Sequence, residues 1–221
     1  MTNTCTDDLP TIFARLLDDP ELRYADGEAI LAHAQACLEA ATTAFAGSGY
    51  HAASLREIAA TVGVSTSALG HHFASKEDLL IAVLGRRDDV TAAAVRDVEG
   101  RPALDGLRLI VDGVAARSEA EAGLIELYVT LSTEAIAADH PAHGYFAERY
   151  RAVIAETTEL FAQAQREGAL PAHLDPAFEA VWWVALWDGL QVQWLYEPEA
   201  IDIRGLLLGH VDSLRSLGSA G

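Results

Sequence analysis

The sequence predicts an all-α protein in which a small three-helix N-terminal domain precedes a larger helical C-terminal domain. Apolar residues recur at intervals of three and four along several segments, which is the spacing of a single helix face. Candidate N-caps precede these segments, and Gly or Pro residues follow them. No strand pattern or hairpin turn stands out. With 221 residues, the chain can bury a substantial core, either in one domain or in a small module plus a larger one.

Residues 1–28 are predicted to form an N-terminal extension, and the first helix covers residues 29–48. Within the extension, residues 11–17 form either a short amphipathic helix or a disordered segment, and Asp26 is a candidate N-cap. A Gly-Ser-Gly sequence ends the helix. We expect Cys37 to be a small buried residue on it, because the two cysteines show no metal-ligand or CxxC spacing. The inner face consists of Ile30, Ala34, Leu38, Ala41 and Phe45.

A short second helix is predicted directly after Ser54. Ser54 is its N-cap, and Glu57 three residues later completes a capping box. Gly63 follows the last apolar position, where a left-handed backbone ends a helix without a steric clash. The apolar face of this helix consists of Leu55, Ile58, Ala59 and Val62.

A third helix begins only a few residues later, because Ser65 is a second N-cap. Ser75 then caps a longer helix that begins at Lys76. This arrangement is typical of a helix-turn-helix, the unit that places a helix in a DNA groove. An ordinary helical hairpin has the same caps and periodicity and remains an alternative. The apolar residues available for burial between the two short helices are Val64, Leu69 and Phe73.

The net charge of −18 is distributed unevenly along the chain. Residues 1–28 carry two basic and seven acidic side chains, residues 29–90 carry four and six, and residues 91–221 carry nine and twenty. The helix-turn-helix segment is therefore nearly neutral, and most of the acidity lies elsewhere. We expect only a small non-specific electrostatic attraction to DNA. Backbone N–H groups at helix starts, hydroxyl groups and the pairing of two modules would have to supply much of the affinity.

Five more helices are predicted after a break around Pro102. Proline and glycine residues lie in the breaks between them. The predicted helices cover residues 104–117, 121–138, 142–167, 176–195 and 202–217.

The helix at residues 176–195 is unusual in being apolar on nearly all sides. Such a helix must be buried on nearly all sides, which suggests packing within its own domain on one face and against a second subunit on another. Simple core burial of each tryptophan is the alternative. One stripe contains Trp183, Trp187, Leu190 and Trp194, and the neighbouring stripe contains Trp182, Leu186 and Gly189.

The segment from Ser54 to Leu80 closely resembles the DNA-binding domain of TetR-family transcriptional regulators. The resemblance runs from about residue 29 to residue 84 and is densest in SLREIAATVGVSTSALGHHFASKEDLL. It implies a helix-turn-helix DNA-binding domain at residues 29–75 and a ligand-binding and dimerisation domain at residues 76–221. It also implies a homodimer that binds a palindromic operator in double-stranded DNA. A small-molecule effector in the larger domain would change the separation of the two DNA-binding heads and release a repressor.

The resemblance places DNA-contacting residues in and around the second short helix. It puts His71 near DNA, packs His72 against the domain core, and makes Lys76 a phosphate contact. Gly70 stands where the family commonly has an aromatic residue, so a contact is lost and the helix is weaker by about 1 kcal/mol than with alanine. A solvated helix start or simple capping would also explain the hydroxyl residues. The candidate DNA-binding residues are Ser54, Ser65, Thr66, Ser67, Gly70, His71 and Lys76.

Asp188 is a charged residue on the tryptophan-rich helix, and a buried carboxylate needs a partner. That partner is either a polar or cationic ligand or an internal group such as Arg149 or a Trp N–H. The candidate ligand-binding residues are Trp183, Trp187, Asp188, Glu126, Tyr128 and Tyr145. By resemblance, the last two helices pair with those of a second copy in a four-helix bundle, and the candidate interface residues are Trp182, Leu186, Gly189, Leu206, His210 and Leu214.

Several other classes of protein are disfavoured by the sequence. It contains no Gly-rich phosphate loop, nucleophile elbow or HExxH spacing, so we expect no catalytic residues, no metal and no cofactor. No apolar run approaches a membrane span, and the first ten residues lack the regions of a signal peptide, so we expect a cytoplasmic protein without a membrane partner. A helical protein-protein interaction module that does not bind DNA remains the alternative, since the chain is acidic.

Overall fold

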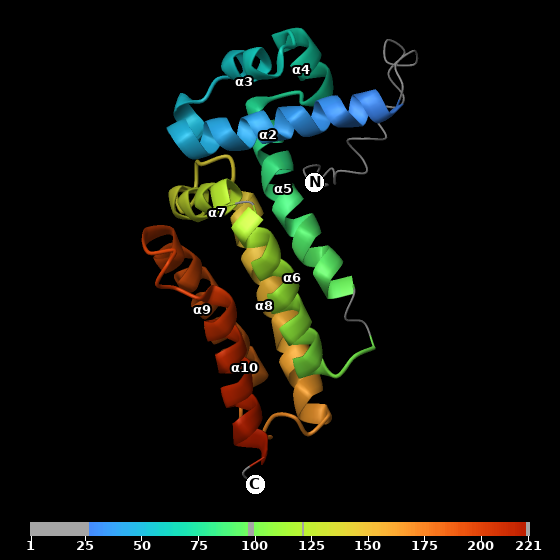
Figure 1. Cartoon of the computed structure of the whole chain (residues 1–221), viewed down its shortest axis with the longest axis vertical. Coiled ribbons are helices and arrows are strands. Elements are labelled where there is room, and N and C mark those ends of the chain that lie inside the picture. The colour runs from blue at the N-terminus through green and yellow to red at the C-terminus, as the bar shows by residue number, and fades with distance from the viewer. Residues whose placement is uncertain (1–26, 97–99, 121, 220–221) are drawn as a thin grey trace. The chain divides into compact units, whose positions relative to one another are not determined.

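In the computed structural model of this chain, the residues described are 27–96, 100–120 and 122–219. All the regular elements among them are α-helices (Figure 1). The chain divides at Asp89 into two compact units, called here the N-terminal and C-terminal units. The predicted extension, including residues 11–17 and Asp26, lies outside the described residues. Within the described ranges, no helix is long and apolar enough to cross a membrane.

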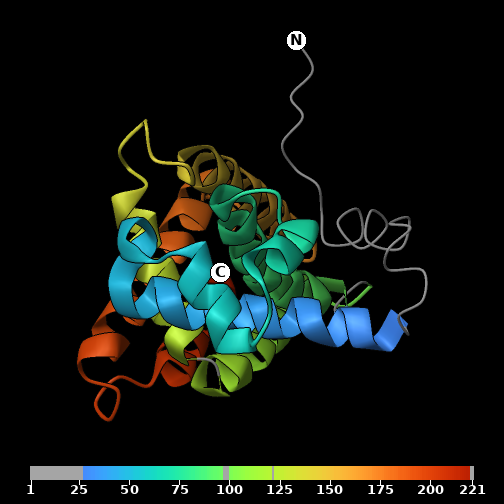
Figure 2. The same ribbon diagram turned by 90° about the horizontal axis from the view of Figure 1, so that it is seen from above.

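The N-terminal unit contains α2 (Gly27–Ala52), α3 (Leu55–Val62), α4 (Thr66–His72) and the first part of α5 (Lys76–Arg96). The short helices α3 and α4 lie on the same side of α2 in Figure 1, and the view from above in Figure 2 shows them over it. Most residues of the predicted apolar faces, together with four residues of α5, are buried and form the core: Ala34, Leu38, Ala41, Phe45, Ile58, Ala59, Leu69, Phe73, Leu79, Leu80, Val83 and Leu84. Leu55, Val62 and Val64, which were also predicted to be buried, are partly exposed, and the side chain of Ile30 lies outside those described. Cys37 is also buried, which raises the pKa of its thiol.

Helix α2 has a kink at Gly49, where the prediction placed its end. Gly49 has a φ of 77° and a ψ of 164°, so the helix is interrupted there. Helical structure then resumes as far as Ala52, and the Ala53 N–H donates to the Gly49 carbonyl oxygen at 3.3 Å. This extra turn buries Tyr50, whose ring centroid lies 5.7 Å from that of Phe45.

The C-terminal unit contains α6 (Ala103–Ala120), α7 (Ala122–Glu134), α8 (His143–Arg166), α9 (Pro176–Tyr196) and α10 (Ile203–Ser219). Helix α8 packs against α6 and α9, and α10 packs against α6 and α9. The large buried side chains at the centre of this core are Leu104, Leu107, Val111, Phe161, Leu170, Trp183, Leu190, Leu207, Val211 and Leu214.

The predicted helices of this unit match the observed ones within a few residues, and α7 shows the largest difference. It ends at Glu134, four residues before the predicted end, and turns follow. Ala135 is buried, and its carbonyl oxygen accepts a hydrogen bond from Nδ1 of His143 at 2.8 Å. This contact, between residues eight positions apart, stabilises the turn where the alanine-rich sequence by itself favours helix.

Candidate functional site

The α3–α4 pair in the N-terminal unit has the predicted caps. Ser54 Oγ accepts a hydrogen bond from the Glu57 N–H at 3.2 Å, and Ser65 Oγ accepts one from the Ala68 N–H at 3.0 Å. Between the two helices, Gly63 has a φ of 78° and a ψ of 22°, the left-handed conformation that the sequence predicted. The capping predictions for these two serines and the glycine are therefore confirmed, and the turn between the helices is tight.

Helix α4 has one buried residue and a broad polar surface. Leu69 is 0% exposed and anchors the helix on the core. Thr66 and Ser67 in the first turn are exposed, and so are Gly70 and His71 one turn later. A Cβ atom added at Gly70 would meet nothing within 4 Å, so internal packing does not explain this glycine. The exposed surface of α4 therefore consists of two hydroxyls, an imidazole and a bare stretch of backbone.

The two adjacent histidines of α4 lie in different surroundings. His71 is exposed, whereas His72 is half-buried, and its Nδ1 atom is buried without a hydrogen-bond partner among the described residues. Burial lowers the pKa of His72, and the charges of His33 and His71 lower it further. Both effects favour the neutral form of the half-buried His72, and His71 is the exposed imidazole of this helix.

Lys76 is attached to the end of α2 by two contacts that sequence reasoning missed. Its Nζ atom donates a hydrogen bond to the His51 carbonyl oxygen at 3.2 Å and lies 4.4 Å from the centroid of the Tyr50 ring. Burial lowers the pKa of this lysine. The ammonium group thus stands at the C-terminal end of a helix, where the helix dipole favours a cation.

The other described cations of this unit add little positive potential. Arg56 is exposed on α3, and Arg86 forms an ion pair with Glu39 at 3.8 Å. Acidic Glu77 and Asp78 occupy the first turn of α5, and the Ser75 hydroxyl donates to Asp78 Oδ2 at 2.9 Å. Among the described side chains of residues 29–90, which carry four basic and six acidic groups in all, no positively charged patch therefore forms.

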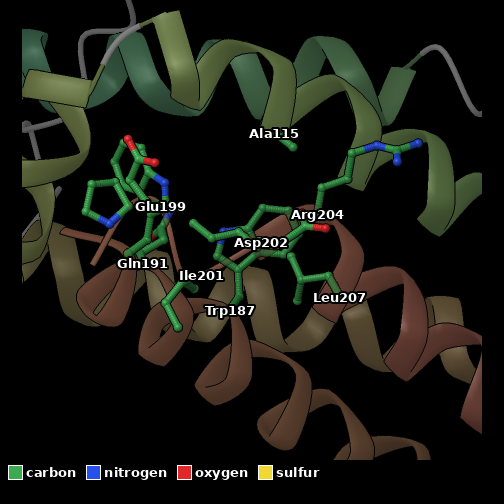
Figure 3. Close-up of a pocket in the computed structure, with 11 residues that line it drawn as sticks. Ala115, Trp187, Gln191, Glu199, Ile201, Asp202, Arg204 and Leu207 are labelled. Carbon is green, nitrogen blue, oxygen red and sulfur yellow. The ribbon is translucent and has the colours of Figure 1, made fainter. Parts of the chain in front are cut away.

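A cavity of about 250 Å³ lies in the C-terminal unit beside α6, α9, α10 and the connection between the last two helices (Figure 3). Its walls combine two indole rings with aliphatic side chains, and polar groups are interspersed among them. The residues that line it are Ala115, Trp187, Gln191, Trp194, Pro198, Glu199, Ile201, Asp202, Ile203, Arg204 and Leu207.

Trp187 is the one predicted ligand-binding residue that lines this cavity. Trp183 is buried in the core instead. Asp188 lies about 100° further around α9 than Trp187, and its Oδ2 atom accepts a hydrogen bond from the Tyr150 hydroxyl of α8 at 2.8 Å. Asp188 therefore has a partner within its own chain, as the alternative prediction held, although that partner is Tyr150 and not Arg149.

The remaining predicted ligand residues lie on α7 and α8, away from the lining of this cavity. Glu126 is exposed. Tyr128 is 3% exposed, and its hydroxyl accepts a hydrogen bond from Nε of Arg149. Tyr145 packs edge-on against the Phe146 ring with centroids 5.2 Å apart. Within the described residues, no group of three His, Cys, Asp or Glu side chains could hold a metal ion.

A row of apolar side chains on α9 and α10 is exposed in the single chain. Among the predicted interface residues, Trp182 is 59% exposed and Leu206 is 48% exposed, whereas Leu186 and Gly189 are partly covered. Leu214 corrects the prediction, because it is 4% exposed and belongs to the core of its own unit. The other large apolar residues exposed on α9 are Phe178, Val181, Val192 and Tyr196.

His210 occupies an intermediate position between this exposed row and the core. Its ring stacks on Trp183 at a centroid distance of 6.0 Å, and its Nε2 atom is buried without a hydrogen-bond partner among the described residues. Burial lowers the pKa of His210, while the nearby Glu179 opposes that shift.

Comparison with known proteins adds sequence relatives and structural neighbours. FasR, a transcriptional activator of Mycolicibacterium smegmatis, is 48% identical over 59 residues, which are 27% of either chain. A Rhodococcus protein assigned to the TetR family is 27% identical, with a TM-score of 0.66 over 83% of this chain and 98% of that one. SmeT of Stenotrophomonas maltophilia in complex with triclosan is 21% identical, with a TM-score of 0.72 over 82% and 90%. This chain spans about a quarter to a half of the length of the curated relatives it matches.

Two family profiles cover most of the described residues. The profile of bacterial regulatory proteins of the tetR family matches residues 38–83, which contain the α3–α4 pair. The profile of the C-terminal domain of BetI-type transcriptional repressors matches residues 103–216, which contain the cavity and the exposed apolar row. The chain belongs to the TetR family of bacterial regulatory proteins, with a C-terminal domain of the BetI type.

Proposed function

We propose that this protein is a transcriptional repressor that binds a palindromic DNA operator as a homodimer and is released by a small molecule. The observation that carries the proposal is the α3–α4 pair, in which a tight turn joins two short capped helices and the second exposes polar groups. We assign DNA binding to residues 29–75, and ligand binding and dimerisation to residues 76–221. We expect the protein to act in the cytoplasm.

Helix α4 is the element that would enter the major groove. The N-terminal residues of such a helix contact base edges, and Thr66 and Ser67 are exposed there. Short hydroxyls can bond either a base or a phosphate. His71 lies one turn later, and Gly70 beside it would let the backbone approach the DNA closely. Sequence preference would therefore come from the first turn of α4.

Phosphate contacts would come from helix starts and from Lys76. Ser54 and Ser65 stand at the N-terminal ends of α3 and α4, where backbone N–H groups favour anions. Lys76 adds a formal charge whose position is fixed by Tyr50 and the His51 carbonyl group. Because these contacts are few, each head would bind weakly, and specific binding would require two heads on one operator.

The exposed apolar row on α9 and α10 would form the dimer interface. Large apolar side chains at helical spacing are costly to leave in water, and aromatic residues are enriched in interfaces. Trp182 and Tyr196 lie on this row of α9, and Leu206 lies on α10. An isologous pair of such surfaces gives a two-fold axis, which corresponds to a palindromic operator.

A ligand bound in the C-terminal unit would control the affinity for DNA. SmeT, a protein of the same fold, has a structure in complex with triclosan, and a Saccharomonospora viridis regulator has one in complex with choline. A bound ligand shifts DNA affinity only as far as it prefers one arrangement of the two heads over another. The assignment as a repressor is supported by the BetI-type profile.

Random-site selection with the purified, ligand-free protein at low salt tests this proposal. We expect a palindromic sequence to be enriched. Thr66→Ala should change the preferred sequence, whereas Lys76→Met should weaken binding to all sequences evenly and flatten the salt dependence. Thr43→Ala, an exposed threonine on α2, is the matched control and should change neither. Failure to enrich any palindrome would contradict the proposal.

A further inference from the structure

Gly70 of α4 is not required by the fold of its own unit. It lies inside the helix and is not among the glycines with a positive φ, so alanine could adopt the same backbone conformation. A Cβ atom there would meet nothing within 4 Å. Glycine weakens a helix relative to alanine, and α4 has only seven residues. No packing contact with the described residues offsets this cost.

The open space at Gly70 lies on the exposed side of α4. At 100° per residue, the four exposed residues of this helix cover an arc of about 140°, in which Gly70 lies between Thr66 and Ser67, one turn further along. Side chains of a helix lean toward its N-terminus, so a side chain at residue 70 would cover the backbone beside those two residues. With glycine this space stays open. We call it the Gly70 notch, and it is bounded by Thr66, Ser67 and His71.

The backbone around the Gly70 notch is held at both ends of the helix. At the start, Ser65 Oγ accepts a hydrogen bond from the Ala68 N–H at 3.0 Å. At the end, the Phe73 N–H donates to the Leu69 carbonyl oxygen at 3.0 Å, and the Leu69 side chain is 0% exposed. The notch is therefore present before any partner binds, and filling it requires little ordering of the chain.

The chemistry of the Gly70 notch suits a small apolar group. Its floor is the Cα atom of Gly70, and the neighbouring Thr66 side chain carries a methyl group. Among the bases, thymine alone presents a methyl group in the major groove, at its C5 atom. Cytosine has no group at that atom and would leave the notch empty. A side chain at residue 70 would occupy the same space and exclude the methyl group of the base.

From these observations we propose that Gly70 is a specificity-determining residue, and that the Gly70 notch receives the 5-methyl group of one thymine in each half of the operator. The inference rests on the proposed function, because it assigns a base to the helix that would enter the major groove. The tetR-family profile, which matches residues 38–83, includes all of α4. Thr66 and Ser67 would then contact the polar edges of neighbouring bases or phosphates.

Deoxyuridine is the direct probe, because it differs from thymidine only by the missing 5-methyl group. Each thymine of the operator enriched by random-site selection is replaced in turn, at symmetric positions of both halves. Binding of the full-length protein is then measured by fluorescence anisotropy. Burial of one methyl group contributes about fourfold to affinity. At one thymine, the symmetric replacement should therefore weaken binding of the parent protein about 15-fold.

Gly70→Ala places a methyl group of the protein in the notch. The same deoxyuridine replacement should then weaken binding less than about twofold. Alanine favours the helix more than glycine does, so this loss of discrimination is not a consequence of unfolding. Gly47→Ala is the matched control, because Gly47 is an exposed glycine of α2 whose Cβ atom would also meet nothing within 4 Å. This control should keep the 15-fold effect.

Two results would each overturn the role of Gly70. In the first, no thymine of the enriched palindrome shows the loss of affinity in the parent protein. In the second, Gly70→Ala discriminates between thymine and uracil as strongly as the parent does. Either result with an enriched palindrome would leave the regulator in place. Enrichment of no palindrome would overturn the regulator, and the role of Gly70 with it.

Discussion

Two glycines of the α3–α4 pair should respond to the same substitution with opposite signs. Gly63 lies in the left-handed region at a φ of 78°, whereas Gly70 lies inside α4. A Cβ atom at either position would meet nothing within 4 Å, so packing contributes to neither change. Gly63→Ala should therefore destabilise the N-terminal unit, and Gly70→Ala should stabilise it, through backbone conformation alone.

The two expected effects are similar in size. A left-handed alanine costs about 1–2 kcal/mol, and the lower entropy of the unfolded chain offsets about 0.4–1 kcal/mol of that. Gly63→Ala should thus lower the free energy of unfolding by about 1 kcal/mol. Gly70→Ala should raise it by about 1 kcal/mol, the difference in helix propensity. A change of about 1 kcal/mol alters the ratio of folded to locally unfolded molecules about fivefold.

Amide hydrogen exchange followed by mass spectrometry would measure both changes in peptides that cover α3 and α4. We expect about fivefold faster exchange in Gly63→Ala and about fivefold slower exchange in Gly70→Ala. The four tryptophans all lie on α9, so urea unfolding followed by Trp fluorescence reports on the C-terminal unit and should not change. Unchanged or slower exchange in Gly63→Ala, or faster exchange in Gly70→Ala, would refute the reasoning.

Three further predictions concern the C-terminal unit. Tyr150→Phe removes the hydrogen-bond donor to Asp188 and should lower the free energy of unfolding by about 1–3 kcal/mol in urea. Because folding raises the pKa of Tyr150, the parent should also lose stability above pH of about 10, and the variant should lack that loss. Folding lowers the pKa of His210, so the free energy of unfolding should fall as the pH drops below about 6.5. This fall should be smaller in His210→Phe. An equal loss of unfolding free energy in both proteins between pH 7.5 and pH 5.5 would contradict the prediction. Trp182→Glu should produce monomers in light scattering, whereas Leu109→Glu, on α6, should not.

The sequence predicted the N-terminal unit well because its signals are local. Ser54, Gly63 and Ser65 act through hydrogen bonds and backbone angles within three or four residues of themselves. The contacts of Lys76 with the end of α2 were missed, because they join residues 25 positions apart. Tyr50 near the end of α2 was the sequence signal for these contacts, but its pairing with Lys76 depends on how α5 crosses α2.

The cavity of the C-terminal unit was harder to predict for the same physical reason. The cavity combines Ala115 of α6 with residues of α9, α10 and their connection, and sequence periodicity does not show how three helices meet. Trp187 was predicted as an apolar wall beside Asp188, and it lines the cavity although Asp188 does not. For Asp188 the sequence left a ligand and an internal partner open, because a charged residue on an apolar helix points equally to both, and the structure shows an internal partner, Tyr150.

The scarcity of cations in the N-terminal unit has a consequence for how such a protein would search a genome. Non-specific affinity comes almost entirely from contacts between cations and phosphates, and residues 29–90 carry only four cations, one of which, Arg86, is paired with Glu39. The millions of unrelated DNA sites in a genome would therefore bind few molecules of this protein. Sliding along the duplex would be brief, and encounters would occur mainly by diffusion through solution. Occupancy of the operator would then depend on the number of copies per cell more than on competition from the rest of the chromosome.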